Sequence, residues 1–252
     1  KDQPLQAIAA NIPSDNVGNQ LIQIAQSKGI PLLFYGTQPS PSVMDVSEQT
    51  RFIGARTEEW GAGMGEIALK LWDEQPALDV NKDGKLQYVL LGPGDGIPET
   101  AVNIIEQAGV DTSVTGEFLK AGDSVTAASF LSSLLERKDK PIEMILCSGE
   151  AAATGAVMAL QTAGYNNGGE PSIPIWACGG TAALRKMTAS GVISGLALPD
   201  SEAEAAAILQ MTDNLGKGAE LMEGLSLEYD PASKTIPISC QFYFGPSQKT
   251  DG

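Results

Sequence analysis

Short apolar runs alternate with amphipathic stretches along the whole chain, and this alternation is the feature that most constrains the fold. The runs predict strands at residues 5–10, 30–35, 51–53, 87–91, 112–119, 143–147, 173–178 and 192–198. The stretches between them, with apolar residues at helical spacing, predict helices at residues 16–27, 57–72, 98–108, 125–136, 151–163, 181–190 and 201–215. Regular alternation with short connections requires parallel sheets with helices on both faces, so we predict an α/β fold.

Ligands of parallel α/β sheets bind beyond the carboxyl ends of the strands. Residues that directly follow a predicted strand are therefore binding candidates, among them Asn11, Glu150 and Asp200. Glu150 and Asp200 also stand where helices begin, and an acidic side chain there can simply cap the helix. For these two residues we favour capping, and a role in ligand binding stays open beside it.

The composition excludes several classes of function. The chain has 31 Asp and Glu against 16 Lys and Arg, a formal net charge of -15, so nucleic acid is not an expected partner. It has no histidine, which removes Ser–His and Cys–His nucleophile pairs. The three cysteines fit no zinc spacing, and Cys147 and Cys178 lie in apolar runs as inert thiols would. Gly92–Gly96 lacks the pattern of a phosphate loop and predicts a tight turn. We therefore expect no catalytic residue and no enzyme activity.

The most specific local signal is the segment Asp79–Gln87, DVNKDGKLQ, which matches the first nine positions of an EF-hand loop. Its candidate oxygen donors are Asp79, Asn81, Asp83, the backbone carbonyl of Lys85, and Gln87. Gly84 occupies the sixth position, where such a loop turns sharply. The twelfth position is Leu90, so a bidentate carboxylate must come from elsewhere in the fold. We favour a calcium (Ca²⁺) loop over a metal-free turn rich in Asp and Asn.

An EF-hand-like loop that leads into a strand resembles the galactose/glucose-binding members of the type I, ribose-binding-like periplasmic solute-binding proteins. The similar segments follow in order: Ala7–Pro13, Ile30–Phe34, Phe52–Gly54, Ile142–Ile145, Thr154–Val157, Ser172–Ile175 and Ser190–Gly195. The resemblance implies two Rossmann-like lobes joined by three crossings, near residues 55, 198 and 236. The first lobe would comprise residues 1–55 and 199–236, and the second, which carries the loop, residues 56–198 and 237–252.

The resemblance also implies roles for single residues. Asn11 matches a sugar-contacting Asn, and Glu143 matches the carboxylate that closes the calcium site. Most other sugar contacts are replaced: Glu99 and Asn103 stand where the family has Asp and Arg, and Ile97 stands where it has His. Each sugar hydroxyl left without a partner costs about 1–3 kcal/mol, so three losses erase micromolar binding. We therefore expect a sugar or related solute other than glucose or galactose. The ligand-binding candidates are Asn11, Glu99, Asn103, Glu150 and Asp200.

The resemblance places Lys1 near the third strand of the first lobe, so we expect that lobe to be incomplete within these 252 residues. Residues outside this sequence, a second chain or a changed architecture would then complete its sheet, because a central strand would otherwise leave its edge unpaired. Without a second chain we expect a monomer.

The function that the resemblance implies is ligand capture between two closing lobes, in the periplasm or on a cell-surface lipoprotein. The ligand would pass to an ABC permease or a membrane sensor, and calcium would be structural. One alternative is a non-transporting sensor or interaction module with a degenerate sugar pocket. A LacI-type regulator shares the fold, but the acidic charge, the calcium loop and the missing helix-turn-helix argue against it. No run approaches the length of a membrane span.

Overall fold

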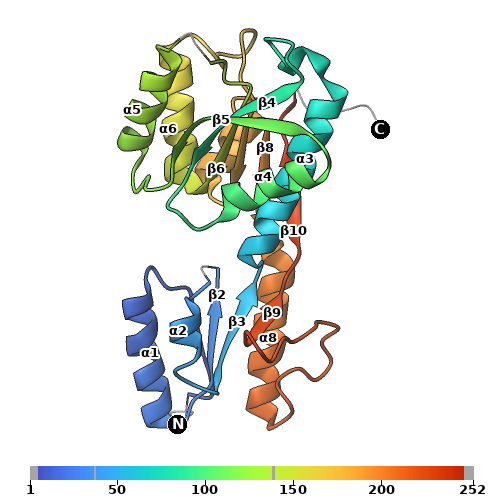
Figure 1. Ribbon diagram of the computed structural model, residues 1–252. Coiled ribbons are helices and arrows are strands. Elements are labelled where there is room, and N and C mark those ends of the chain that lie inside the picture. The colour runs from blue at the N-terminus through green and yellow to red at the C-terminus, as the bar shows by residue number, and fades with distance from the viewer. Residues whose placement is uncertain (1–4, 37, 138–139, 247–252) are drawn as a thin grey trace. The chain divides into compact units, whose positions relative to one another are not determined.

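The computed structural model describes residues 5–36, 38–137 and 140–246, and the chain forms two compact units (Figure 1). Unit 1 comprises Lys1–Arg56 and Pro199–Ser239, and unit 2 comprises Thr57–Leu198 and Cys240–Gly252. Each unit has its own sheet with helices packed on both faces, so the predicted α/β fold class is confirmed.

Unit 1 is built on a four-stranded parallel sheet in the order β1-β2-β3-β9. The strands are β1 (Ile8–Ala10), β2 (Leu32–Tyr35), β3 (Thr50–Gly54) and β9 (Thr235–Pro237). The helices are α1 (Asp15–Lys28), α2 (Pro41–Met44) and α8 (Ser201–Lys217). Side chains alternate along β2, so Leu32 and Phe34 pack with α1 and α2, and Leu33 packs with α8 on the other face.

Unit 2 contains a six-stranded sheet in the order β10-β8-β7-β6-β4-β5. The strands are β4 (Lys85–Leu91), β5 (Asp111–Phe118), β6 (Met144–Ser148), β7 (Ile175–Cys178), β8 (Gly195–Pro199) and β10 (Cys240–Phe244). The helices are α3 (Thr57–Glu74), α4 (Ile97–Gln107), α5 (Ser124–Leu135), α6 (Gly149–Thr162) and α7 (Ala182–Ala189). One core lies beneath α3 and α4, and the other beneath α5, α6 and α7 (Figure 1). The strands β4 to β8 pair in parallel, so their carboxyl ends share one edge.

The helix ends follow the chemistry of their residues. Gly29 ends α1 with a φ of 63°, because the left-handed conformation costs glycine little. Asp200 caps α8 by accepting a hydrogen bond from Ala203 N. The capping interpretation is wrong for Glu150: Ser148 holds the cap position of α6, and Glu150 lies within the first turn of that helix.

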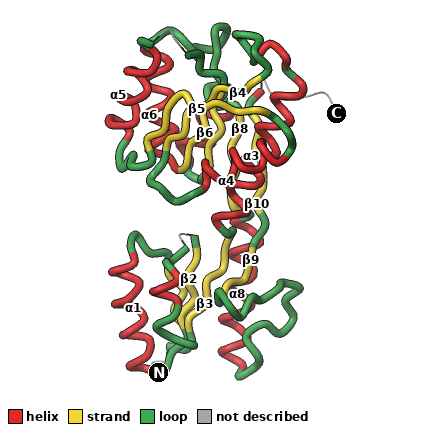
Figure 2. Tube along the Cα trace, viewed as in Figure 1, coloured by secondary structure: helices red, strands yellow, loops and turns green. Residues whose placement is uncertain are grey.

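Two short elements were not predicted from the sequence. The four-residue helix α2 and the 3-10 helix η1 (Pro76–Leu78) each begin at a proline and are shorter than the window in which helical periodicity is visible. In the tail, strand β9 begins at Thr235. Figure 2 shows loop before β9, where Asp230 accepts a hydrogen bond from Ala232 N and closes a turn.

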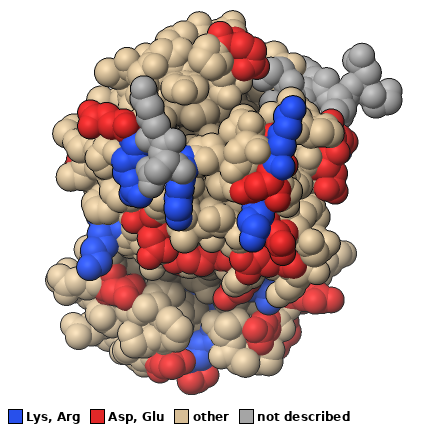
Figure 3. All heavy atoms as spheres, turned by 45° about the horizontal axis from the view of Figure 1, so that its top comes forward, with Lys and Arg blue, Asp and Glu red and all other residues tan. Residues whose placement is uncertain are grey.

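In the part of the chain that the structure describes, no helix has the length and apolar character that a membrane crossing requires. On the face shown in Figure 3, Lys and Arg side chains stand among Asp and Glu side chains and do not merge into one continuous basic surface. This distribution agrees with the acidic composition and with the expectation that nucleic acid is not a partner.

Candidate functional site

The loop Asp79–Gln87 folds around its own acidic side chains. Asp79 accepts hydrogen bonds from the backbone N–H groups of Asp83 and Gly84, at 3.1 and 2.9 Å. Asp83 accepts from Lys85 N at 2.8 Å and from Gln87 Nε2 at 2.8 Å. Gly84 has a φ of 75°, which a side chain would strain. The first, fifth, sixth and ninth positions are therefore tied into one compact loop.

Glu143 reaches this loop from the neighbouring strand. β4 pairs with β6, and Glu143 N donates to Gln87 O at 2.8 Å at the amino ends of these strands. The Glu143 side chain, 2% exposed, accepts hydrogen bonds from Val80 N at 2.8 Å and from Gln87 N at 2.9 Å. The residue that the resemblance assigned to the loop thus lies against it, 56 positions later than Gln87.

One buried oxygen atom of the loop has no hydrogen-bond partner among the described residues. Gln87 is 4% exposed, and its Oε1 atom is buried without a hydrogen bond. An unsatisfied buried oxygen costs about 1–3 kcal/mol, and a bound cation would satisfy it. Within the described ranges, no group of three or more His, Cys, Asp or Glu side chains is placed to hold a metal ion. The donor set here depends on amide and carbonyl oxygens besides carboxylates, as calcium loops do.

The electrostatics of the loop favour a positive charge. Burial raises the pKa of Glu143, and the carboxylates of Asp79 and Asp83 raise it further, against the lowering effect of its two backbone hydrogen bonds. Hydrogen bonds from Gln87 and Lys85 lower the pKa of Asp83. Carboxylate, amide and carbonyl oxygens around one loop match the ligand preference of Ca²⁺, so the residues present fit that ion.

The candidates in unit 2 lie on α4 and α6, two helices that follow the carboxyl ends of β4 and β6. Glu99 lies in the first turn of α4, and Asn103 follows one turn later, exposed to solvent. The Glu99 Oε2 atom is buried and has no hydrogen-bond partner among the described residues. Glu150 lies exposed in the first turn of α6. A buried carboxylate oxygen without a partner makes Glu99 the strongest of these three candidates.

At the carboxyl ends of β6 and β7 the structure shows a series of hydrogen bonds among side chains that were not among the predicted site residues. The Ser148 hydroxyl, at the carboxyl end of β6, donates to Asp95 Oδ2, and Ile97 N donates to Asp95 Oδ1 at 3.2 Å. The Cys178 thiol, at the end of β7, donates to Ser148 Oγ at 3.6 Å. Asp95 is exposed to solvent, and these hydrogen bonds hold its carboxylate at the ends of the strands. All three residues follow or end strands, which was the signal that would have found them.

In unit 1 the candidate Asn11 follows β1 and lies beside Gly36, which follows β2. A Cβ atom on Gly36 would lie 2.7 Å from Asn11 Nδ2, and the φ of Gly36 is 73°, so glycine is required there. Gly36 N donates to Glu204 Oε1 at 3.0 Å. Glu204, in the first turn of α8, is 7% exposed, and burial raises its pKa. Asp200 serves as the cap of the same helix.

The cysteines are unsuited to nucleophilic chemistry. Cys147 and Cys178 are buried, as predicted, and burial raises the pKa of Cys178 to about 11 and that of Cys147 further. Burial also raises the pKa of Cys240 to about 12. Because the thiolate is the reactive form, these thiols are inert near neutral pH.

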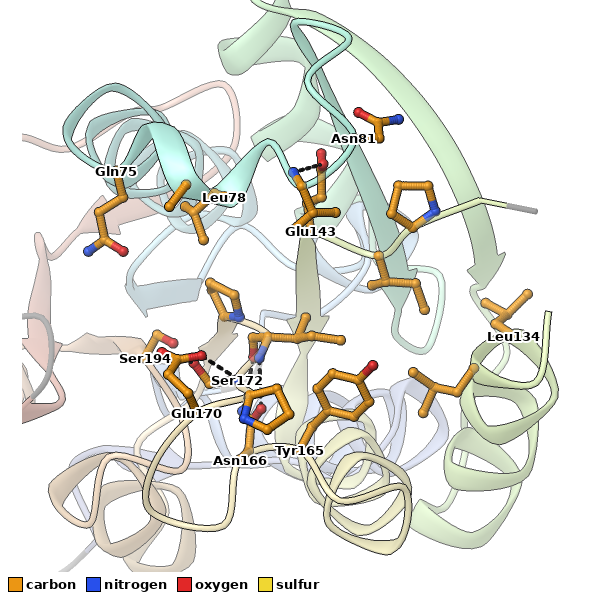
Figure 4. A pocket seen from close by; sticks show the side chains of 18 of the residues that line it. Gln75, Leu78, Asn81, Leu134, Glu143, Tyr165, Asn166, Glu170, Ser172 and Ser194 are labelled. Carbon is orange, nitrogen blue, oxygen red and sulfur yellow. Dashed lines mark hydrogen bonds between the residues drawn. The ribbon is translucent and has the colours of Figure 1, made fainter. Parts of the chain in front are cut away.

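A cavity of about 960 Å³ lies within unit 2 at the opposite end of the strands (Figure 4). Glu143, Pro174 and Ser194, which directly precede β6, β7 and β8, line it. One wall comes from η1 and the start of the loop, with Leu78 and Asn81. None of the five ligand-binding candidates contributes to it.

The sequence matches the family described as periplasmic binding protein domain over residues 2–220. The chain belongs to this family. The predicted resemblance to type I solute-binding proteins is therefore confirmed.

The periplasmic binding proteins that this chain resembles include curated and solved members. It is 28% identical over 240 residues to the D-galactose/methyl-galactoside binding periplasmic protein MglB of Haemophilus influenzae, covering 92% of this chain and 71% of that protein. A solute-binding protein from Actinobacillus succinogenes with bound D-allose has a TM-score of 0.70 at 14% identity, covering 97% and 78%. One from Bacillus halodurans with bound myo-inositol has a TM-score of 0.66 at 15% identity, covering 96% and 76%.

Membership of the periplasmic binding protein family settles two of the predictions. Relatives in this family are solute-binding proteins, so the chain is a binding protein and not an enzyme. The family also implies a place outside the cytoplasm. The fold of the solved relatives agrees with the two α/β units described above.

Proposed function

We propose that this protein captures a sugar or related polyol and delivers it to an ABC permease. The observation that carries the proposal is the family match over residues 2–220, together with polar side chains at the strand ends of each unit. In unit 1 these are Asn11 and Glu204, and in unit 2 they are Glu99 and Asp95. Carboxylates and amides accept and donate the hydrogen bonds that sugar hydroxyls need.

The ligand differs from glucose and galactose in this proposal. The structure has Ile97 buried at the start of α4, where the family has a polar His, so that position offers no hydrogen bond. The hydroxyl partners must then come from other side chains, such as the exposed carboxylate of Asp95. A ligand with a different arrangement of hydroxyls, such as a rarer hexose, a pentose or an inositol, fits that change better.

Isothermal titration against D-glucose, D-galactose, D-allose, D-arabinose and myo-inositol tests the proposal. We expect one of the last three to bind more tightly than glucose and galactose. Asn11→Ala in unit 1 and Glu99→Gln in unit 2 should each weaken that ligand on the order of 10-fold, because each removes a hydrogen bond to a buried hydroxyl. Gln161→Ala, on α6 outside the candidate set, is the control.

Binding of all five compounds too weak to measure, by a protein that melts cooperatively, would contradict the transport proposal. The alternative is then a sensor or interaction module that recognises another protein through a degenerate pocket.

We also propose that Asp79–Gln87 and Glu143 hold a structural Ca²⁺. Asp79, Asn81, Asp83, Gln87 and Glu143 would supply side-chain oxygens, and Lys85 its carbonyl. The ion would satisfy Gln87 Oε1 and screen the repulsion among the three carboxylates. Chelation should then lower the melting temperature without abolishing sugar binding, because stabilisation by a ligand grows with its concentration relative to Kd. An unchanged melting temperature on adding EDTA and then Ca²⁺ would contradict this proposal.

A further inference from the structure

The cavity at the amino ends of β6, β7 and β8 is separate from the sugar-binding candidates, and it adjoins the loop Asp79–Gln87 through Asn81 and Glu143. Pro174 and Ser194 line it and directly precede β7 and β8. The sugar-binding candidates of unit 2 lie beyond the other ends of the strands. A strand of four or five residues is about 15 Å long, so about that distance separates the cavity from the carboxyl ends of these strands.

The cavity has the size and lining of a small-molecule site. Its volume of about 960 Å³ lies at the upper end of the range of about 300–1,000 Å³ for such pockets. Leu78, Leu134 and Ile142 give it apolar walls, and the ring of Tyr165 reaches into it from the loop after α6 (Figure 4). A ligand in this cavity would therefore meet apolar and polar side chains in comparable measure.

Several polar side chains of the lining are already engaged. Both carboxylate oxygens of Glu143 accept backbone hydrogen bonds from Val80 and Gln87. The Asn166 side chain donates to Ile173 O at 2.9 Å and to Val192 O at 3.1 Å, and accepts from Ile173 N at 2.8 Å. These hydrogen bonds fix both side chains in the wall of the cavity.

Two donors in the lining are not engaged. Across the described ranges, neither the Lys140 ammonium nor the Tyr165 hydroxyl has a hydrogen bond or ion pair, and both residues line the cavity. Figure 4 shows the Tyr165 hydroxyl directed into the open space. An ammonium and a phenol hydroxyl are together best matched by an anionic oxygen, because hydrogen bonds to charged acceptors are the stronger ones.

We propose that this cavity binds a small amphipathic anion, a carboxylate or sulfonate with an apolar body. The body would contact Leu78, Leu134 and Ile142, and the anionic group would accept hydrogen bonds from Lys140 and Tyr165. The cavity is then a second ligand site, and its occupation does not depend on whether the protein binds sugars.

The test is a titration of the full chain, in calcium-containing buffer, with the fluorescent probe anilinonaphthalene sulfonate. We expect saturable binding of one probe per chain. Lys140→Glu should weaken the probe at least about 10-fold, because it replaces attraction by repulsion. Tyr165→Phe keeps the ring and should weaken it about 3- to 10-fold. The matched control is Lys120→Glu, a lysine just beyond the opposite end of β5, which should leave the affinity unchanged.

Two further readouts make the proposal falsifiable. Decanoate should displace the probe, and D-allose, D-arabinose and myo-inositol should not. The proposal is overturned by the absence of saturable binding to a cooperatively melting protein, by equal affinities of the three variants, or by displacement with a sugar. Displacement by uncharged decanol as effectively as by decanoate would likewise overturn the anionic assignment.

Discussion

Replacing Gln87 by Leu separates its hydrogen bond to Asp83 from the calcium-binding role that we propose for it. Without a metal, Gln87→Leu removes a buried oxygen that lacks a partner, a gain of about 1–3 kcal/mol. It also removes the 2.8 Å hydrogen bond to the Asp83 carboxylate, a loss of about 1.5–3 kcal/mol. These terms nearly cancel, so in EDTA the free energy of unfolding should change by less than about 1 kcal/mol.

With calcium the same substitution should be costly, because the ion loses one oxygen donor. We expect the calcium affinity to fall on the order of 10- to 100-fold. At a calcium concentration about 100 times the wild-type Kd, the ion stabilises the wild type by about 2.7 kcal/mol. The variant should lose about half of this or more, which is a difference of about 3–10 °C in melting temperature for a protein of this size.

The assay is a pair of thermal melts, in EDTA and in calcium, with the affinity measured by calorimetry. Gln161→Leu, at an exposed glutamine on α6 that donates a hydrogen bond to Asn166 O, is the control and should leave the calcium affinity unchanged. If the free energy of unfolding of the variant in EDTA is more than about 2 kcal/mol below that of the wild type, the assignment of Gln87 Oε1 as unsatisfied is refuted. A calcium affinity equal to that of the wild type would refute its role as a ligand.

Three further substitutions test the packing and the electrostatics. In Gly195→Ala the new Cβ would lie 1.7 Å from the ring of Trp176, which is 2% exposed, so a loss of at least about 3 kcal/mol is expected in a circular-dichroism melt. Lys234→Met removes a buried ammonium that donates to two backbone carbonyls at 3.2 Å, and urea unfolding should show a loss of about 2 kcal/mol. Burial raises the pKa of Glu204 in the folded state, so the folded form binds the proton more tightly and wild-type stability falls as pH rises from the unfolded pKa through the folded pKa. Urea titrations should therefore show that Glu204→Gln gains stability relative to the wild type across that interval and not below it; an equal difference at pH 3 and pH 7 would contradict this.

The sequence predicted the fold because its strands and helices have regular periods. Every predicted strand between residues 5 and 198 has a counterpart, within a few residues at each end. What the sequence could not predict follows from contacts between distant residues. The approach of Glu204 to Gly36, 168 positions apart, depends on how α8 packs across the sheet. No local pattern contains that information.

In the candidate calcium site, too, local patterns identified some residues and contacts between distant residues determine the others. The loop donors occupy fixed positions in nine consecutive residues, so a motif could find them. Glu143 needed a resemblance, because only the pairing of β4 with β6 brings it to the loop. Asp95 follows β4 and Ser148 ends β6, so the rule that ligands bind at the carboxyl ends of parallel strands could have identified both residues. Their mutual hydrogen bond depends on side-chain orientations, which the rule does not give.

The arrangement of unit 2 assigns different roles to the two ends of one sheet. Beyond the carboxyl ends, Asp95 is exposed and held in place by buried neighbours, as a group that contacts a varied ligand should be. At the amino ends, Glu143 is buried and accepts a backbone hydrogen bond on each carboxylate oxygen, as a group that joins two strands should. Substitutions at the carboxyl ends can therefore change the ligand while the loop and its strand pairing keep the sheet intact. For this reason the proposed calcium loop could be kept while the proposed sugar contacts change in the same chain.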